Sequence, residues 1–388
     1  MFKSFKMLIL LSVSFLLVSF VSVSAQEEDG ISIGGAFRYN FFVRMYESDL
    51  NVGDIQKTWD TWRLNVSGLM DGFLLDFEYR FYPVGQVHFI QRGWVGYRWN
   101  DNTQLELGVT QVPFGNLPYA SHSYFFSTAY YVGLEDDYDM GVKVTHTVNN
   151  FDLALAYFIQ SEPHGTTAIP DGNPEAARYS YDLIPVEGQS NEERNQVNAR
   201  VAYNLPLGLL GGLEVGVSAQ YGQIFNSVVA DEDAWSDRYA AAFHIDADIG
   251  QFNLLANTIL YNYNAVDDQG NSLETVTKGA YGWPYSIASK AMMYTVGLAY
   301  TLPFQIGPAT VTVYNNYTFT DKDNDQFENT QQNVLGASVG AGPIFAYIDL
   351  ASGYNHPWLT DFFGVGLDEG QQDPQWNHRL NINFGYYF

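Results

Sequence analysis

The feature that constrains this chain most is a strict alternation of side chains in residues 376–388, at its C-terminal end. One face of an extended strand there would carry Leu380, Ile382, Phe384, Tyr386 and Phe388, and the other Arg379, Asn381, Asn383 and Gly385. A period of two with an apolar and a polar face indicates a strand between two solvents. A sandwich strand would alternate in the same way, but the C-terminal position and the aromatic ending favour a transmembrane β-barrel, with lipid on one side and water on the other.

The same alternation recurs from residue 31 onward in segments of roughly ten residues. It is clearest at 73–81, where Phe73, Leu75, Phe77, Tyr79 and Phe81 share one face. The pattern predicts an all-β, antiparallel transmembrane barrel of about sixteen strands, although fourteen or eighteen are also compatible with it. We expect strands at 31–46, 58–70, 73–81, 87–99, 103–111, 138–148, 151–160, 194–203, 213–222, 238–248, 251–263, 290–302, 309–319, 331–340, 343–353 and 376–388.

The connections between these segments are alternately short and long, apart from a short one at 82–86. Tight turns of residues that tolerate positive φ fall at 71–72, 100–102, 149–150, 249–250 and 341–342. Long, acidic loops fall at 47–57, 112–137, 161–193, 223–237, 264–289, 320–330 and 354–375. Outer-membrane barrels have short periplasmic turns and long extracellular loops, so we expect both chain ends on the periplasmic side.

The first residues have the layout of a cleavable secretory signal. Lys3 and Lys6 precede an apolar stretch at 7–21, and small residues at 23–25 lead into an acidic segment. We therefore expect a signal peptide at 1–25 and a barrel at 26–388; an uncleaved anchoring helix is the alternative. The chain has no cysteine, which excludes a disulfide framework, a thiolate metal site and a lipid anchor through cysteine.

The charge balance limits the partners. The chain has 18 basic and 43 acidic residues, and 16 basic residues remain once Lys3 and Lys6 are removed with the signal. Such an acidic chain is unsuited to nucleic acid or to anionic lipid headgroups. We expect no nucleic-acid partner, no cofactor and no bound metal.

A barrel of sixteen strands is too wide for its own wall side chains to fill, so the default expectation is a water-filled channel. The face opposite the apolar one carries most of the arginines, at 38, 44, 63, 80, 92, 98, 194, 200 and 379. Most come from the last strand and the first four, which become neighbours when the barrel closes. They could guide anions, or they could stiffen the wall by pairing with Asp76, Glu78 and Glu106.

The loop at 112–137 is rich in aromatic residues and ends in three acidic residues, Glu135, Asp136 and Asp137. The segment Gly108 to Gly115, which ends in Pro-Phe-Gly, and the later Asp139-Met140-Gly141 resemble the phosphate-selective porin O and P type family. The C-terminal strand resembles the assembly signal of outer-membrane barrels. These resemblances imply the outer membrane of a Gram-negative-type bacterium, contact with lipid and lipopolysaccharide, a homotrimer, and a loop that folds inward to constrict the pore.

The interpretation that follows is a porin for passive diffusion of small hydrophilic solutes or ions. Its selectivity residues are expected to be Arg38, Arg63, Arg80, Arg92 and Arg379, opposed across the pore by Glu135, Asp136 and Asp137. The acidic loop end and the negative net charge depart from the phosphate-selective pattern, and they predict a mild cation preference. Surface exposure of the loop is the alternative.

Two other functions stay open. Trp283, Tyr314 and Tyr347 could stack sugar rings in a substrate-specific uptake channel for carbohydrate, phosphate or another anion. A non-conducting surface barrel could bind a partner or divalent cations through acidic loops, for example at Asp321, Asp323, Asp325 and Glu328. We expect no enzyme, because His146 and His378 have no evident serine companion in the sequence.

Overall fold

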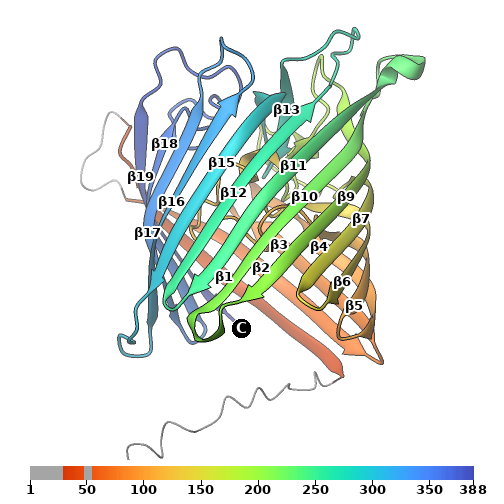
Figure 1. Cartoon of the computed structure of the whole chain (residues 1–388). Coiled ribbons are helices and arrows are strands. Elements are labelled where there is room, and N and C mark those ends of the chain that lie inside the picture. Colours follow the sequence, from red (N-terminus) through yellow and green to blue (C-terminus); the bar gives the residue numbers. More distant parts are fainter. Residues whose placement is uncertain (1–28, 48–54) are drawn as a thin grey trace, which may run out of the picture.

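The computed structural model describes residues 29–47 and 55–388, and the predicted signal peptide at 1–25 lies outside these residues. The described chain forms a closed barrel of sixteen antiparallel strands (Figure 1). They are β1 (Gly30–Arg44), β2 (Gln56–Met70), β3 (Phe73–Tyr82), β4 (Val87–Asn100), β5 (Thr103–Gln111), β6 (Tyr138–Val148), β7 (Phe151–Ser161), β9 (Asn191–Pro206), β10 (Gly211–Asn226), β11 (Trp235–Ile249), β12 (Phe252–Tyr263), β15 (Lys290–Thr301), β16 (Thr310–Lys322), β17 (Thr330–Ala341), β18 (Ile344–Tyr354) and β19 (Trp376–Tyr387).

The barrel closes by pairing the first strand with the last. Phe37 of β1 lies opposite Tyr386 of β19, and Arg38 lies opposite Gly385. On β19, Leu380, Ile382 and Phe384 are exposed on the outer face while the alternate asparagines are buried inside. The number of barrel strands and their order along the chain are as predicted from the period of two, so the predicted fold class is confirmed.

Short turns join the strands at one rim and long loops join them at the other (Figure 1). The turn between β2 and β3 needs positive φ at both of its residues, and Asp71 and Gly72 have φ of 50° and 83°. Five short 3₁₀ helices lie in connections: η1 (Val84–Gln86), η2 (Tyr130–Val132), η3 (Pro174–Ala176), η4 (Gly208–Leu210) and η5 (Asp231–Ala234). No helix in the described residues has the length and apolar character needed to cross a bilayer.

The outer surface of the barrel is apolar. Phe73, Leu107 and Leu155 are 65%, 57% and 60% exposed, and they come from different strands around the circumference. A soluble protein rarely exposes so much apolar surface, whereas a barrel in hydrocarbon requires it. This arrangement explains where the many aromatic and aliphatic residues of the alternating segments go.

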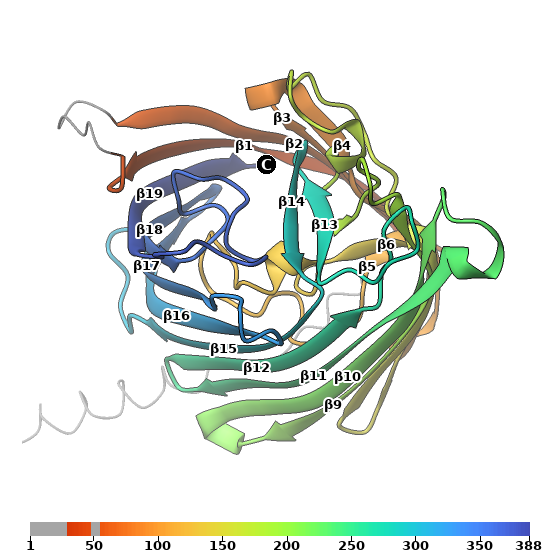
Figure 2. The same cartoon turned by 90° about the horizontal axis from the view of Figure 1, so that it is seen from above.

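Three further strands lie in the long loops and were missed by the sequence analysis. A hairpin of β13 (Thr275–Ala280) and β14 (Trp283–Ala288) pairs with β8 (Asp182–Leu183) in a small sheet separate from the barrel. Here we name the long loops L3 (112–137), L4 (162–190), L6 (264–289) and L8 (355–375). L4 supplies β8 and L6 supplies the hairpin, and Figure 2 shows this sheet within the ring of barrel strands.

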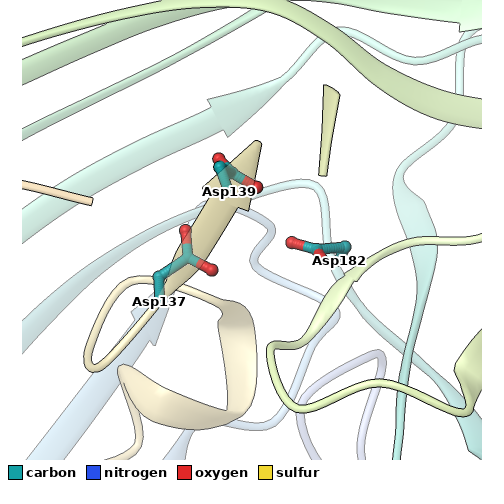
Figure 3. A group of neighbouring side chains, drawn as sticks. All are labelled: Asp137, Asp139 and Asp182. Atoms are coloured by element: carbon teal, nitrogen blue, oxygen red, sulfur yellow. The ribbon is translucent and has the colours of Figure 1, made fainter. Parts of the chain in front are cut away.

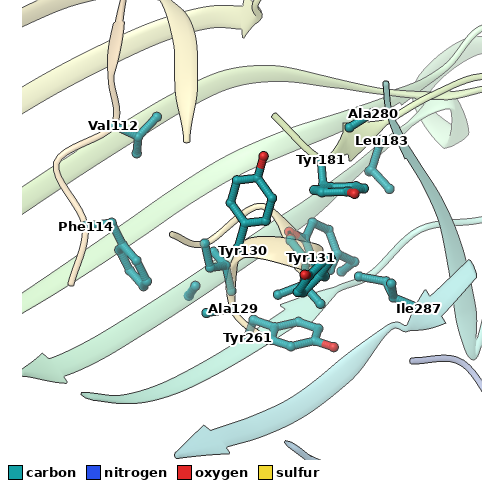
Figure 4. Close-up of a cluster of buried hydrophobic side chains, with 14 of the residues drawn as sticks. Val112, Phe114, Ala129, Tyr130, Tyr131, Tyr181, Leu183, Tyr261, Ala280 and Ile287 are labelled. Atoms are coloured by element: carbon teal, nitrogen blue, oxygen red, sulfur yellow. Dashed lines mark hydrogen bonds between the residues drawn. The ribbon is translucent and has the colours of Figure 1, made fainter. Parts of the chain in front are cut away.

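A hydrophobic core lies inside the barrel, between these loops and one side of the wall (Figure 4). L3, L4 and L6 contribute Tyr130, Tyr181 and Ile287, and β12 contributes Tyr261. The wall residues of this core belong to strands from β4 to β15. The expectation of a simply water-filled lumen therefore needs a correction, because folded loops occupy this side of it.

Candidate functional site: a cavity between arginine strands and aromatic loops

L3 crosses the inside of the barrel and is hydrogen-bonded to the wall at widely separated strands (Figure 2). The Gly115 amide donates to Ser218 Oγ of β10 at 2.8 Å, and Asn116 Nδ2 donates to the carbonyl of Ile245 on β11 at 2.9 Å. Farther along L3, the Tyr124 amide donates to Asp349 of β18 at 3.2 Å. These contacts hold the loop at a fixed depth in the lumen.

Opposite the apolar core, the space left between L3, L4, L6, L8 and the remaining wall is a cavity of about 990 Å³. Its wall residues come from β17, β18, β19, β1, β2 and β3, with Val87 of β4 at one edge. The cavity reaches the long-loop rim, where Gly85 and Trp283 line it, and the short-turn rim, where Gly342 and Pro343 line it. A passage across the barrel requires a cavity that reaches from one rim to the other, as this one does.

Five arginines line this cavity, namely Arg38, Arg44, Arg63, Arg80 and Arg379. Asp60 is the one acidic residue among its lining residues. Four of the five arginines predicted as selectivity residues thus lie together, and the fifth, Arg92, does not line the cavity. Arg92 instead pairs with Asp76 at 2.9 Å and with Glu78 at 2.7 Å.

Three carboxylates offset part of the charge of these five arginines. Arg38 pairs with Asp60 at 3.0 Å, and Arg44 pairs with Glu47 at 2.7 Å. Glu78 pairs with Arg80 at 2.5 Å and lies 3.8 Å from Arg63, in addition to its contact with Arg92. One carboxylate is therefore shared by three guanidinium groups. These pairs stiffen the wall, and the five lining arginines still outnumber the three carboxylates that pair with them.

Arg379 has no acidic partner among the described residues. Its Nη2 donates to Asn381 at 2.8 Å, and its guanidinium lies 4.0 Å from the centre of the Phe42 ring and 5.5 Å from that of Phe125. Its Nε is buried without a hydrogen-bond partner. Contacts with ring faces position the guanidinium while leaving its charge uncompensated.

The other side of the cavity is aromatic. Its rings come from L3, L4, L6 and L8: Tyr119, Tyr124, Phe125, Phe126, Tyr130, Tyr131, Tyr179, Tyr181, Tyr281, Trp283 and Trp358. Arginines of the wall contact this face directly, with Arg80 4.3 Å from the centre of the Tyr179 ring and Arg38 5.3 Å from that of Tyr124. The loop residues at 179, 181 and 358 were not predicted as site residues; the alternation Tyr179-Ser180-Tyr181 within a loop was the available signal.

The three acidic residues at the end of L3 do not line the cavity, and the predicted opposition of charges across the pore is absent from the described residues. Glu135 is 3% exposed and accepts from the amides of Ala120 and Ser127, both at 2.9 Å, and from the Ser127 hydroxyl. Asp136 accepts from Tyr179 Oη at 2.5 Å, and burial raises its pKa to about 7. A buried carboxylate needs donors, and the folded loops supply them.

Asp137 is likewise buried, at 6% exposure, and it accepts the hydrogen bond of the Tyr138 amide at 3.0 Å. Glu135, Asp136 and Asp137 thus hold L3 in its fold and against L4. The three carboxylates that were expected to oppose the arginines accept hydrogen bonds within the folded loops instead.

The two histidines considered for catalysis lie on the exposed outer surface. Ser352 Oγ of β18 lies 2.8 Å from His378 Nδ1 of β19, and Thr103 Oγ1 lies 2.9 Å from His146 Nδ1. The serine companion of His378 was missed because it comes from the neighbouring strand. No hydrogen bond within the described chain joins the second ring nitrogen of His378 to an orienting carboxylate, as a hydrolytic triad would need.

The fold is that of bacterial outer-membrane porins. OmpF of Salmonella typhi, in complex with Daunomycin, matches with a TM-score of 0.61 and 12% identity, over 93% of this chain and 98% of that one. The outer-membrane channel DcaP of Acinetobacter baumannii matches with a TM-score of 0.58 and 11% identity, over 94% and 99%. An anion-selective porin from Comamonas acidovorans matches with a TM-score of 0.55 and 14% identity, over 93% and 100%.

No protein-family model matches the sequence, and no curated protein matches it. Identities this low establish the fold alone. They agree with an integral barrel of the Gram-negative outer membrane, and the narrower resemblance to the phosphate-selective family stays a prediction.

Proposed function

We propose that this protein is an outer-membrane channel through which small hydrophilic solutes diffuse passively, with a preference for anions. The observation that carries the proposal is the cavity between the two rims, whose lining holds five arginines and one aspartate. A channel lined by one sign of charge concentrates ions of the opposite sign. The predicted cation preference is abandoned, because the carboxylates on which it depended are buried inside the loops.

Conductance and ion preference can be measured together in a planar lipid bilayer. The purified protein should give ohmic steps, and in a salt gradient of KCl the reversal potential should have the sign of chloride permeation. A silent barrel would favour the surface-binding alternative. A cation-selective current would refute the role given to the arginines.

A second candidate is a substrate-specific channel, and the aromatic face favours it. Seventeen aromatic residues line the cavity, and a volume of about 990 Å³ falls at the upper end of the range of small-molecule sites, about 300 to 1,000 Å³. Aromatic rings beside guanidinium groups suit an anion with a flat apolar part, and they also suit sugar rings. Saturating block of the current by one solute at micromolar to millimolar concentration would support this function over unspecific diffusion.

The assembly is also a proposal. OmpT of Vibrio cholerae, which matches with a TM-score of 0.56 and 13% identity over 93% of this chain and 100% of that one, is described in a trimer form. On the outer surface of this barrel, rings of β1 and β2 and the ring of the C-terminal Phe388 contact one another, with Phe37 5.7 Å from Phe388 and 6.1 Å from Trp62 between ring centres. This aromatic surface suits either lipid or a second copy. The mass of the detergent-solubilised protein distinguishes a homotrimer from a monomer.

A further inference from the structure

A group of carboxylates lies buried where L3 ends and β6 begins. Asp137, Asp139 and Asp182 are 6%, 1% and 1% exposed, and each offers a carboxylate oxygen within 4.8 Å of the others. Figure 3 shows Asp137 and Asp139 coming from one chain segment and Asp182 facing them from another. None of the three lines the arginine cavity, so this group is separate from the proposed channel.

Some oxygen atoms in this group have no donor. Asp139 Oδ2 accepts a hydrogen bond from Gln196 Nε2 at 3.1 Å. The other carboxylate oxygen of Asp139, Oδ1, is buried without a hydrogen-bond partner. Glu162, also 1% exposed, accepts from the amides of Tyr179 and Ser180 through Oε1, and its Oε2 is buried without a partner. Burying a carboxylate oxygen without a hydrogen-bond donor or a cation costs far more folding free energy than burying one that has such a partner.

The cations nearby are already engaged. Lys278 Nζ donates to Glu193 at 3.1 Å and to the carbonyl of Tyr181 at 3.0 Å. Arg238 pairs with Glu193 at 2.5 Å, and Arg178 pairs with Asp182 at 3.3 Å. When all of them are ionised, the five carboxylates at 137, 139, 162, 182 and 193 carry two more charges than the three basic side chains beside them.

We propose that Asp137, Asp139 and Asp182 bind a calcium ion. Its charge would balance the excess of two negative charges of the ionised carboxylates, and the orphaned Oδ1 of Asp139 lies in the group that would hold it. Calcium takes six to eight oxygen ligands at about 2.3 to 2.6 Å, so oxygens on opposite sides of the ion are about 5 Å apart, which fits this group. Magnesium dehydrates reluctantly and keeps several waters, and a buried site of protein oxygens suits it less.

The ion would join three parts of the structure. Asp137 ends L3, Asp139 lies in the barrel wall, and Asp182 lies in β8, whose partner β13 belongs to L6. Calcium at this point fixes the loop assembly to the wall, and with it the aromatic face of the cavity. The inference does not depend on the proposed channel, because it is tested by metal content and loop protection.

The test uses the purified, folded protein in detergent, stripped with EDTA and then dialysed against calcium. We expect about one calcium per chain by elemental analysis. Calcium should also protect the segment from Tyr130 to Tyr138 from hydrogen exchange, relative to EDTA. Replacing Asp139 by Asn should weaken binding about tenfold or more, because one charged ligand is lost.

The matched control is Asp101→Asn. Asp101 lies in the exposed turn between β4 and β5, away from both groups of acidic residues, and the variant should bind calcium as the parent does. Heat-dependent mobility in a gel shows whether each variant has folded, and Asp182→Asn replaces Asp139→Asn if that variant has not. The parent alone can also refute the site: no bound calcium at millimolar concentration would overturn the proposal, and so would equal binding by a folded Asp139→Asn or Asp182→Asn variant.

Discussion

His356 holds L8 against the rest of the loop assembly through contacts that only the neutral imidazole can make. Its Nδ1 accepts from the amides of Trp358 at 3.1 Å and Leu359 at 3.3 Å. The proton therefore resides on Nε2, which donates to Gln332 Oε1 of β17 at 3.2 Å. The ring is fully buried and stands edge-on to Tyr131 of L3 at 4.8 Å.

Burial lowers the pKa of His356 to about 3, whereas a histidine in an undocked loop titrates near 6.5. Between these values the undocked loop binds more protons than the docked one. The docking free energy is complete above pH 6.5 and falls by about 1.4 kcal/mol for each pH unit below it. At pH 5 the loss is about 2 kcal/mol, which is roughly a thirtyfold shift toward the undocked loop.

Hydrogen exchange of residues 355–367, corrected for the intrinsic pH dependence of exchange, measures this shift between pH 7.5 and pH 5. We expect a strong loss of protection in the parent. In His356→Asn, whose side-chain oxygen can still accept from the amides but does not titrate, the dependence should vanish. His164→Asn, at an exposed histidine of L4, is the control and should behave as the parent. If His356→Asn keeps the parent's pH dependence, another group is responsible and the reasoning is refuted.

Three further predictions concern the cavity. Replacing Arg379 by Gln should reduce the anion preference about fivefold, which is the effect of one unit charge about 4 Å from a permeating ion in water. The control is Arg194→Gln, which lies away from the cavity and should leave the reversal potential unchanged. Asp60→Asn removes the acidic residue of the lining and should raise anion preference in the same assay; a shift toward cations would contradict the assignment. Glu135→Gln should weaken the docking of L3 by about 2 kcal/mol, because Glu135 accepts hydrogen bonds from amides of that loop. The single-channel current should become larger and noisier, and the reversal potential should change little because Glu135 does not line the cavity.

The barrel could be predicted from the sequence because its cause is local. Each strand must place alternate side chains in lipid, so the period of two is written into every segment, as at Phe73 to Phe81. The same alternation put Arg38, Arg63, Arg80 and Arg379 on the inner face, and closure of β1 on β19 brings Arg379 beside the others. Arg92 shows the limit of this reasoning, since an inward position does not decide whether a neighbouring carboxylate takes up the side chain.

The interior loops could not be predicted in this way. An acidic run such as Glu135 to Asp137 has the composition of an exposed loop, and its burial depends on donors far away in the sequence, including the Tyr179 hydroxyl. The strands β8 and β13 pair across nearly a hundred residues and are too short to give a clear period. Long-range packing, and not local pattern, decides these positions.

The division of the lumen explains why the net charge of this chain says little about its passage. The chain has a formal net charge of −25, yet the residues that line the cavity carry more positive than negative charge. On one side, strands from β4 to β15 meet apolar loop residues, and the acids found there, such as Glu135, accept hydrogen bonds inside the protein. On the other side, strands from β17 to β3 present five arginines, of which Arg63 and Arg80 share one carboxylate, Glu78, and Arg379 has no acidic partner among the described residues. An ion in the cavity experiences the charges within about a Debye length that are not already paired, so the arrangement of the loops decides the sign of the pore.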